Sequence, residues 1–468
     1  MESRLSLRRA AGVLAIGLAA VLGAAAPASA GSTGSHPAHR RTLVDPAPCP
    51  EVANFTCAYL SVPLDHRGAT PGRLRLRVAV ADNAAAPRGV LLLLTGGPGQ
   101  PGPGLAARIV TRLAPLLTDY RLVLIDQRGT GAGAINCPRL QSAVGSSDVL
   151  APSAAAVTEC ATLLGNTRNF YTTADTVADL DDLRRALGVS RWTMDGISYG
   201  TFVAERYALT HPGHVRRLVL DSVVPQTGAP ALYEESLHRT GWVLRQACAE
   251  QHCAFDPAAD LATVVRRDGN GVGVLNLLII ASIFDPRLTG DQFFPVLEML
   301  HASATGNPGP LNFAIQTVGT GEGTPPDQFS SGLHAATLCA DLDDAPWGDA
   351  SAPLAGRDRD VQRALSKVDP QAVWPYEPRT AVDQGLVATC RYWPPSRPNP
   401  APRLDRLTMP VLLLAGDRDL STPLEWARRQ AAHASRARLV VVPGMGHSIQ
   451  GRNPVGDAAV REFLLGHA

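Results

Sequence analysis

The order of apolar and polar positions predicts alternating strands and helices. Residues 74–80 alternate as Leu-Arg-Leu-Arg-Val, a period of two that is typical of a half-buried strand. Short apolar runs typical of buried strands lie at 90–94, 122–125, 192–194, 215–220, 411–414 and 439–442. Helical spacing of apolar residues marks 176–187, 199–210, 424–433 and 455–464. This alternation predicts an α/β fold, a mostly parallel sheet flanked by helices on both faces.

The alternation is lost between residues 225 and 402, where helical and proline-broken segments dominate. We interpret 225–402 as a helical cap inserted between two core strands, with core parts at 51–224 and 403–468. Residues 31–50 are polar and proline-rich, which predicts a flexible segment. The apolar stretch at 272–283 is interpreted as a buried cap helix, and a lipid-facing lid is the alternative.

The first thirty residues predict a signal peptide. Arg4, Arg8 and Arg9 precede an apolar run over 10–26. The sequence Ala-Ser-Ala at 28–30 follows this run and is typical of a cleavage site. The run is short and broken by glycines, so we do not expect a stable membrane anchor. These features predict a secreted, extracellular protein that is cleaved near Ala30.

Charge and composition narrow the function further. The 468 residues carry 43 basic and 42 acidic side chains, a net charge of +1, without a block of like charge. We therefore expect no nucleic-acid partner. Separately, we expect the protein to be a monomer. Lys367 is the single lysine, which argues against a Gly-Lys-Ser/Thr phosphate loop and against lysine-based catalysis.

Eight cysteines stand in a chain that is expected to meet an oxidising compartment, where disulfides are the default. The chain has no Cys-x-x-Cys pair, so we expect neither a zinc site nor a redox motif. Many connectivities are open. The simplest pairs nearest neighbours: 49–57, 137–160, 248–253 and 339–390.

Residues 196–200 read Gly-Ile-Ser-Tyr-Gly, between a predicted strand and a predicted helix. A tight strand-to-helix turn projects a serine hydroxyl above a sheet, and it needs glycines where other side chains would clash. The motif therefore predicts Ser198 as a nucleophile.

A serine nucleophile needs a base and an acid that orients the base. Asp419 follows the predicted strand at 411–414, and His447 follows the one at 439–442. The order Ser198, Asp419, His447 is that of the α/β-hydrolase fold. Asp417 is the rival acid; we favour Asp419 because it lies farther past the strand.

The loop at 96–99, Gly-Gly-Pro-Gly, allows two interpretations. Residues 97–102 match Gly-x-Gly-x-x-Gly after a strand, which would indicate a dinucleotide site. Pro98 and Pro101 remove backbone donors that such a site needs. We favour an oxyanion hole formed by the N–H groups of Gly97 and Tyr199, with no cofactor and no metal.

From about Cys57 onward, the chain resembles the secreted tripeptidyl/prolyl aminopeptidase-like branch of the α/β-hydrolases, whose C-terminal region is called TAP-like. The resemblance rests on Val-Pro-Leu-Asp at 62–65, Gly-Gly-Pro-Gly at 96–99, Asp-Gln-Arg-Gly-Thr-Gly at 126–131, Ser-Tyr-Gly-Thr at 198–201, Leu-Asp at 220–221, Cys-Ala-Asp at 339–341, Asp419 with Thr422-Pro423, and Gly-His at 446–447. Two positions depart from the family pattern: Thr95 stands where His is frequent, and Ile197 where Gly is common.

The resemblance implies a serine exopeptidase that removes amino acids or short peptides, such as tripeptides, from a peptide substrate with a free N-terminus. A secreted carboxylesterase or lipase-like hydrolase and a catalytically silent binding protein are the alternatives. A cationic amine in a closed pocket needs a carboxylate partner. The predicted cap offers Glu234, Glu235, Asp341, Asp343 and Asp344, and we favour Asp341 because it belongs to the family's Cys-x-Asp segment.

Overall fold

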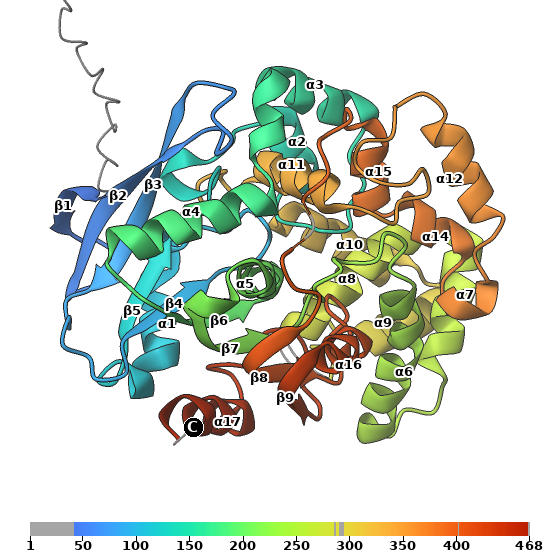
Figure 1. Cartoon of the computed structure of the whole chain (residues 1–468). Coiled ribbons are helices and arrows are strands. Elements are labelled where there is room, and N and C mark those ends of the chain that lie inside the picture. Colours follow the sequence, from blue (N-terminus) through green and yellow to red (C-terminus); the bar gives the residue numbers. More distant parts are fainter. Residues whose placement is uncertain (1–41, 285–286, 290–293, 401, 467–468) are drawn as a thin grey trace, which may run out of the picture. The chain divides into compact units, whose positions relative to one another are not determined.

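The computed structural model describes residues 42–284, 287–289, 294–400 and 402–466. The predicted signal peptide and the first part of the predicted flexible segment lie outside these residues. In the described part, nine strands form one sheet in the order β1-β2-β3-β5-β4-β6-β7-β8-β9 (Figure 1). The strands are β1 (Leu43–Pro48), β2 (Phe55–Pro63), β3 (Arg73–Ala81), β4 (Val90–Leu94), β5 (Arg121–Ile125), β6 (Trp192–Ile197), β7 (Val215–Asp221), β8 (Leu407–Gly416) and β9 (Ala434–Val442).

The sheet is mostly parallel, as predicted. Strands β5, β4, β6, β7, β8 and β9 run parallel, and β1, β2 and β3 add an antiparallel edge next to β5. The prediction that 31–50 is flexible is wrong for Leu43–Pro48, because these residues pair with β2. Five of the six residues of β1 are exposed, so the strand has no apolar pattern that sequence reasoning could detect.

Helices cover both faces of the sheet. One hydrophobic cluster joins the sheet to α4 (Thr173–Ala186), α5 (Tyr199–Thr210) and α16 (Leu424–Ala432). A separate cluster joins the sheet to α1 (Ala106–Leu113) and α17 (Pro454–Leu465). The central strands β4, β5, β6 and β7 are mostly buried on both faces, which is why they appear in the sequence as short apolar runs.

The chain between β7 and β8 is helical, where the sequence predicted the cap. It contains α6 (Glu234–Gln251), α7 (Pro257–Asp268), α8 (Gly271–Phe284), α9 (Val296–Ala304), α10 (Gly309–Gly321), α11 (Ser331–Asp341), α12 (Arg357–Leu365), α13 (Pro370–Val373), α14 (Pro378–Asp383) and α15 (Gly385–Tyr392). Residues of α2 (Pro138–Val144) and α3 (Ala154–Leu164) share a hydrophobic cluster with these helices. Because Arg41–Ala468 forms one compact unit, the domain boundaries stay a prediction.

Helix α8 contains the apolar stretch at 272–283, for which the sequence allows a buried helix or a lipid-facing lid. Ten of its fourteen residues are buried, and only its last residue, Phe284, is strongly exposed, at 57%. Its C-terminal end reaches the segment of His447: a Cβ on Gly446 would stand 1.6 Å from the carbonyl oxygen of Ser282. The helix therefore packs as a cap helix and touches the candidate site with one end.

All four predicted disulfides are confirmed: Cys49–Cys57, Cys137–Cys160, Cys248–Cys253 and Cys339–Cys390. The last of these bonds links α11 to α15, 51 residues apart in the chain. Within the described ranges, no helix is both long enough and apolar enough to cross a bilayer.

Candidate active site

Ser198 stands in a strained turn between β6 and α5. Its backbone angles are φ 56° and ψ −128°, a left-handed conformation that is costly for a residue with a side chain. The flanking glycines permit the turn. A Cβ on Gly196 would stand 2.4 Å from the carbonyl oxygen of Gly200, and one on Gly200 would stand 2.3 Å from that of Leu94.

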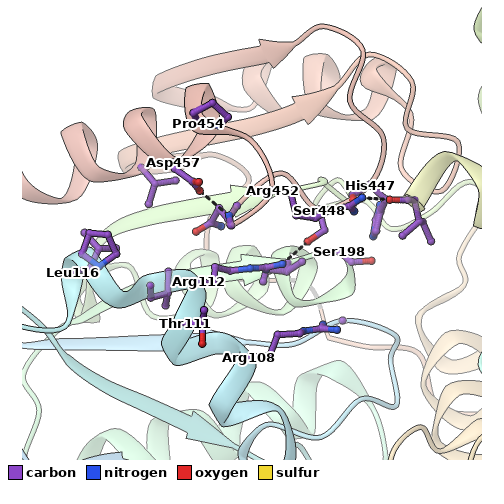
Figure 2. Close-up of a pocket in the computed structure, with 18 of the residues that line it drawn as sticks. Arg108, Thr111, Arg112, Leu116, Ser198, His447, Ser448, Arg452, Pro454 and Asp457 are labelled. Carbon is purple, nitrogen blue, oxygen red and sulfur yellow. Dashed lines mark hydrogen bonds between the residues drawn. The ribbon is translucent and has the colours of Figure 1, made fainter. Parts of the chain in front are cut away.

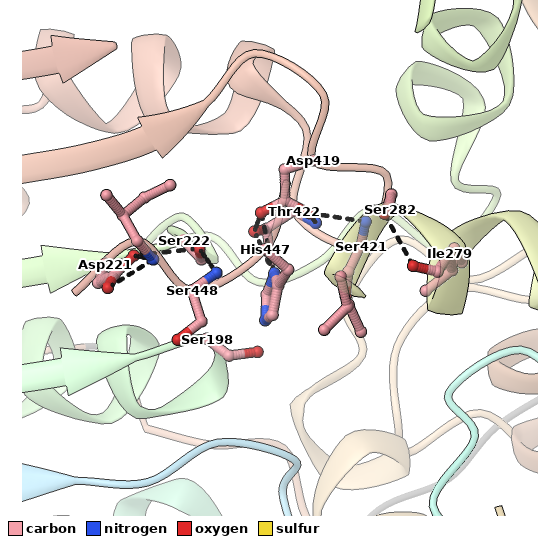
Figure 3. Close-up of polar contacts among 12 residues, drawn as sticks. Ser198, Asp221, Ser222, Ile279, Ser282, Asp419, Ser421, Thr422, His447 and Ser448 are labelled. Atoms are coloured by element: carbon pink, nitrogen blue, oxygen red, sulfur yellow. Dashed lines mark hydrogen bonds and ion pairs between the residues drawn. The ribbon is translucent and has the colours of Figure 1, made fainter. Parts of the chain in front are cut away.

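His447 and Asp419 meet at the carboxyl ends of β9 and β8. The Nδ1 of His447 lies 2.9 Å from Oδ2 of Asp419, so Nδ1 carries a proton and donates it to the carboxylate. Asp419 also accepts the N–H groups of Ser421 and Thr422 and the hydroxyl of Thr422. Figure 3 shows the imidazole between Asp419 and Ser198, with its second nitrogen toward the serine.

Asp417, the rival acid, is engaged elsewhere. Its Oδ1 accepts the N–H of Gly444 at 2.8 Å, and its backbone carbonyl accepts hydrogen bonds from Arg239. The geometry therefore brings Asp419, and not Asp417, to the imidazole.

The pKa values of this pair move in opposite directions. Burial alone would raise the pKa of Asp419, but the charge and hydrogen bond of His447, with the bonds from Thr422, outweigh it and lower that pKa. Burial lowers the pKa of His447, and the charge and hydrogen bond of Asp419 more than compensate, so the net pKa is raised. The nearby Asp221 and Asp148 carboxylates add to this increase. Asp419 therefore stays ionised, and its negative charge stabilises the protonated form of the His447 imidazole.

Gly97 and Tyr199, the two expected donors of an oxyanion hole, line one cavity together with Ser198. Tyr199 is the first residue of α5, so its N–H has no acceptor within the helix. The glycine loop approaches closely: a Cβ on Gly96 would stand 2.9 Å from the Cβ of Ser198. Gly97 has φ +106°, a conformation that favours glycine. The arrangement can hold negative charge on a substrate oxygen above Ser198.

Two cavities meet at Ser198. The larger, of about 990 Å³, also contacts His447 and is lined by Arg108, Arg112 and Arg452; we call it the arginine cavity (Figure 2). The smaller, of about 50 Å³, is lined by Gly97, Tyr199 and two carboxylates. We call it the acidic cavity, after Asp148 and Asp341.

Asp341 lies in the acidic cavity, at the C-terminal end of α11. Its carboxylate accepts the hydroxyl of Thr173 at 2.5 Å and a hydrogen bond from the side-chain amide of Asn399. Because the single hydroxyl hydrogen of Thr173 is used in the bond to Asp341, Thr173 is the acceptor in its other hydrogen bond. The Tyr199 hydroxyl, 2.6 Å away, is therefore the donor. Burial raises the pKa of Asp341 to about 6, against the effect of these hydrogen bonds. Asp341 is thus connected to the residue that follows Ser198.

Asp148 is a second carboxylate in the acidic cavity, and sequence analysis missed it. It lies in the loop after α2, and its Oδ1 is 3.4 Å from Nε2 of His334. Burial raises its pKa, although the positive charges of His334 and His447 oppose this. No motif marks Asp148, because the tertiary fold alone brings its loop to the site.

Glu234 and Glu235 were the other candidates for binding the substrate amine. Both line a different cavity, which Ser198, Gly97 and Tyr199 do not line. Glu235 is bonded to the indole N–H of Trp426 and to Arg429. The fold therefore separates these two glutamates from the candidate nucleophile.

Family models match two parts of the chain. A model described as the alpha/beta hydrolase fold matches residues 89–269, and one described as a TAP-like protein matches residues 375–467. The chain has the α/β-hydrolase fold. The first match contains Ser198, and the second contains Asp419 and His447. The α/β-hydrolase fold predicted from the sequence is thus confirmed.

Named relatives agree with this assignment. This α/β-hydrolase is 26% identical to a tripeptidyl aminopeptidase of Streptomyces coelicolor, over 87% of this chain and 80% of the relative. It is 37% identical to a probable proline iminopeptidase of the same species, over 30% of this chain and 34% of the relative. The serine protease Hip1 of Mycobacterium bovis is 26% identical, over 56% of this chain and 52% of the relative. The chain is an enzyme of the serine hydrolase class.

Proposed function

We propose that this α/β-hydrolase is a serine exopeptidase that removes amino acids or short peptides from the free N-terminus of a peptide. One observation carries the proposal: a cavity with two carboxylates, Asp148 and Asp341, adjoins Ser198. The names of the relatives, a tripeptidyl aminopeptidase and a probable proline iminopeptidase, support the same activity.

In this proposal, Ser198, Asp419 and His447 are the catalytic residues. His447 takes the proton of the Ser198 hydroxyl as Oγ attacks the scissile carbonyl carbon, and Asp419 holds the imidazole in the required tautomer. The carbonyl oxygen becomes an oxyanion that accepts the N–H groups of Gly97 and Tyr199. His447 then protonates the leaving amine as the C–N bond breaks, which leaves the acyl group on Ser198.

Water completes the cycle. His447 removes a proton from water, which attacks the ester, and then returns this proton to Ser198 Oγ as the acid product departs. Apart from water, these steps use only groups of the chain: the Ser198 hydroxyl, the His447 imidazole, the Asp419 carboxylate and the two backbone N–H groups.

The acidic cavity supplies the selectivity for a free amine. An α-amino group is cationic below a pKa of about 8, and a narrow pocket without a counter-charge would disfavour it. Asp341 is ionised above its pKa of about 6, so the carboxylate and the ammonium are both charged between these values. The hydrogen bonds that link Asp341 through Thr173 to the Tyr199 hydroxyl support this role, because they connect the carboxylate to the residue that follows Ser198.

We further propose that the enzyme acts outside the cell. The predicted signal peptide ends near Ala30, and the four disulfides fit an oxidising compartment. A secreted form with an N-terminus near residue 31 is the expected product of expression with the native leader.

The decisive experiment compares a peptide with a free N-terminus and its N-acetyl analogue, in the wild type and in Asp341→Asn. We expect the variant to lose at least about 2 kcal/mol of transition-state stabilisation on the free-amine substrate only. Asp343→Asn is the matched control, because Asp343 is an exposed acid of the same segment that does not line the acidic cavity. Equal losses on both substrates would show that Asp341 does not bind the amine.

Two further outcomes separate the alternatives. Faster hydrolysis of simple esters than of any free-amine peptide would identify a carboxylesterase. Failure of a fluorophosphonate probe to label Ser198, in a folded protein, would identify a catalytically silent binding protein.

A further inference from the structure

The arginine cavity combines an unbalanced positive charge with a position beside the candidate catalytic histidine. Four arginines line it: Arg108, Arg112, Arg452 and Arg461. Across the residues that the structure describes, none of these four forms an ion pair with a carboxylate. A cavity lined by four arginines and by a single carboxylate, that of Asp457, is suited to an anionic ligand.

The acidic groups near the cavity do not neutralise it. Asp457 lines the cavity, and its Oδ1 accepts the N–H of Gly451 at 2.7 Å. Asp221 is fully buried and accepts the N–H groups of Ile449 and Gln450. Burial, together with the charge of Arg112, lowers the pKa values of both Arg108 and Arg452, as expected for neighbouring cations.

Two of the guanidinium groups are held in place by the segment of His447. Arg452 donates from Nη1 to the carbonyl oxygen of His447 at 2.7 Å, and Arg112 donates from Nη2 to Oγ of Ser448 at 2.9 Å (Figure 2). A guanidinium has five N–H donors, so each of these groups keeps donors for a ligand. These hydrogen bonds hold the two guanidinium groups against His447 and Ser448, the residue that follows it.

Proton transfer decides which part of the substrate enters this cavity. The base must protonate the leaving amine, so the leaving group has to contact His447. His447 lines the arginine cavity and does not line the acidic cavity. The acyl part and its N-terminal ammonium therefore occupy the acidic cavity, and the leaving group extends along the arginines.

We propose that the arginine cavity is a leaving-group subsite that selects peptides with a carboxylate on the C-terminal side of the scissile bond. The inference rests on the proposed exopeptidase function and extends it. The carboxylate can be the C-terminus of a short peptide or an acidic side chain in the leaving group. The enzyme then prefers substrates with a positive amino end and a negative leaving end, matched to its two cavities.

The test begins with binding, which does not require turnover. Ser198→Ala is titrated with a short peptide free acid and with its C-terminal amide, which differ by one negative charge. We expect the free acid to bind about tenfold more tightly at low salt, because charge-assisted hydrogen bonds form only with the carboxylate. This preference should shrink from about 0.05 M to about 0.5 M salt, because the arginines are partly exposed.

Arginine variants locate the effect. Arg108 donates no hydrogen bond among the described side chains, so Arg108→Gln removes charge with little risk to the fold. Both changes are made in the Ser198→Ala background. Arg108→Gln should lower the ratio of free-acid to amide affinity, and Arg108→Gln with Arg112→Gln should bring this ratio close to one. Arg436→Gln is the matched control, because Arg436 is exposed on β9 and lines neither cavity. It should leave the ratio unchanged.

A third peptide distinguishes the two sources of the carboxylate. This peptide is a C-terminal amide with glutamate directly after the scissile bond. If the arginines bind side-chain carboxylates, it should bind as tightly as the free acid. If they bind the C-terminal carboxylate, only the free acid should bind tightly. Equal affinities of all three peptides in Ser198→Ala would overturn the inference. So would an acid preference that Arg108→Gln and Arg112→Gln leave intact. The proposed function fails separately, if wild-type enzyme cleaves none of the peptides that Ser198→Ala binds.

Discussion

The backbone N–H of Ser198 donates to the backbone carbonyl of Asp221 at 2.9 Å. The side chain of the same aspartate accepts the N–H groups of Ile449 and Gln450, two and three residues after His447. The neighbouring Ser222 hydroxyl accepts the N–H of Ser448 (Figure 3). The end of β7 thus connects the turn that carries Ser198 with the segment that carries His447.

This connection predicts that Asp221 is a positioning residue. Asp221→Asn keeps the shape but replaces one acceptor oxygen by an NH₂ group, which faces N–H donors. We expect kcat to fall by about tenfold to a hundredfold, because His447 shifts relative to Ser198. The carboxylate charge also helps to raise the pKa of His447, so the acid limb of the pH profile should move to lower pH.

A control separates this effect from a general loss of stability. Asp256→Asn alters a helix cap on α7, where Asp256 accepts two backbone N–H groups. It should lower the melting temperature without moving the acid limb. An Asp221→Asn enzyme with an unchanged acid limb would contradict the positioning role.

Ser198→Ala and His447→Ala should each reduce kcat by at least about a thousandfold, because the three residues act as a unit. Asp419→Asn should also be severe, since the imidazole then loses its ionised partner. Asp417→Asn is the matched comparison, with the same substitution two residues away and a hydrogen bond to Gly444 instead of His447. Steady-state rates on one peptide measure all four. A larger defect in Asp417→Asn than in Asp419→Asn would reverse the assignment of the acid.

The sequence predicted the parallel part of the fold well, because buried strands and their helices leave strong apolar patterns. Residues 90–94 and 199–210 were predicted with the bounds that β4 and α5 have. Strand β1 escaped detection because its side chains are mostly exposed, so its pairing depends on backbone hydrogen bonds that any sequence can form.

The candidate site, like the fold, could be predicted from the sequence only in part. Ser198, Asp419 and His447 could be found because a strained turn and strand ends impose local sequence constraints. Asp148 and the arginines of the arginine cavity could not, since no local pattern distinguishes them from surface charges. Their proximity to Ser198 depends on how the segments that follow β4, β5 and β9 pack together.

The pH dependence should differ between substrates with and without a free amine. Because the pKa of His447 is raised, we expect kcat/KM to fall on the acid side from a pH above the ordinary histidine value of about 6.5. On a free-amine peptide it should also fall above about pH 8, where the substrate ammonium loses its proton and its attraction to Asp341. The N-acetyl peptide should lack this alkaline limb. Identical profiles for both peptides would show that the amine charge is not recognised.

The disulfide between Cys339 and Cys390 provides the last prediction, because it joins stability to selectivity. It closes a loop of 51 residues and fixes α11, which ends at Asp341, against α15. Replacing both cysteines by serine should reduce the free energy of unfolding by about 2 to 4 kcal/mol, since the unfolded chain gains freedom. It should also lower the preference for free-amine over N-acetyl peptides, because the carboxylate of Asp341 is then held less rigidly.

Cys49→Ser with Cys57→Ser is the matched control for this prediction. That disulfide lies between β1 and β2, and neither cysteine lines the acidic cavity. Its loss should reduce stability without changing the amine preference. Chemical denaturation gives the stability of both double variants, and kcat/KM on the two peptides gives the preference. If the Cys339/Cys390 double variant keeps the wild-type preference, α15 and the cap packing hold Asp341 without the covalent link.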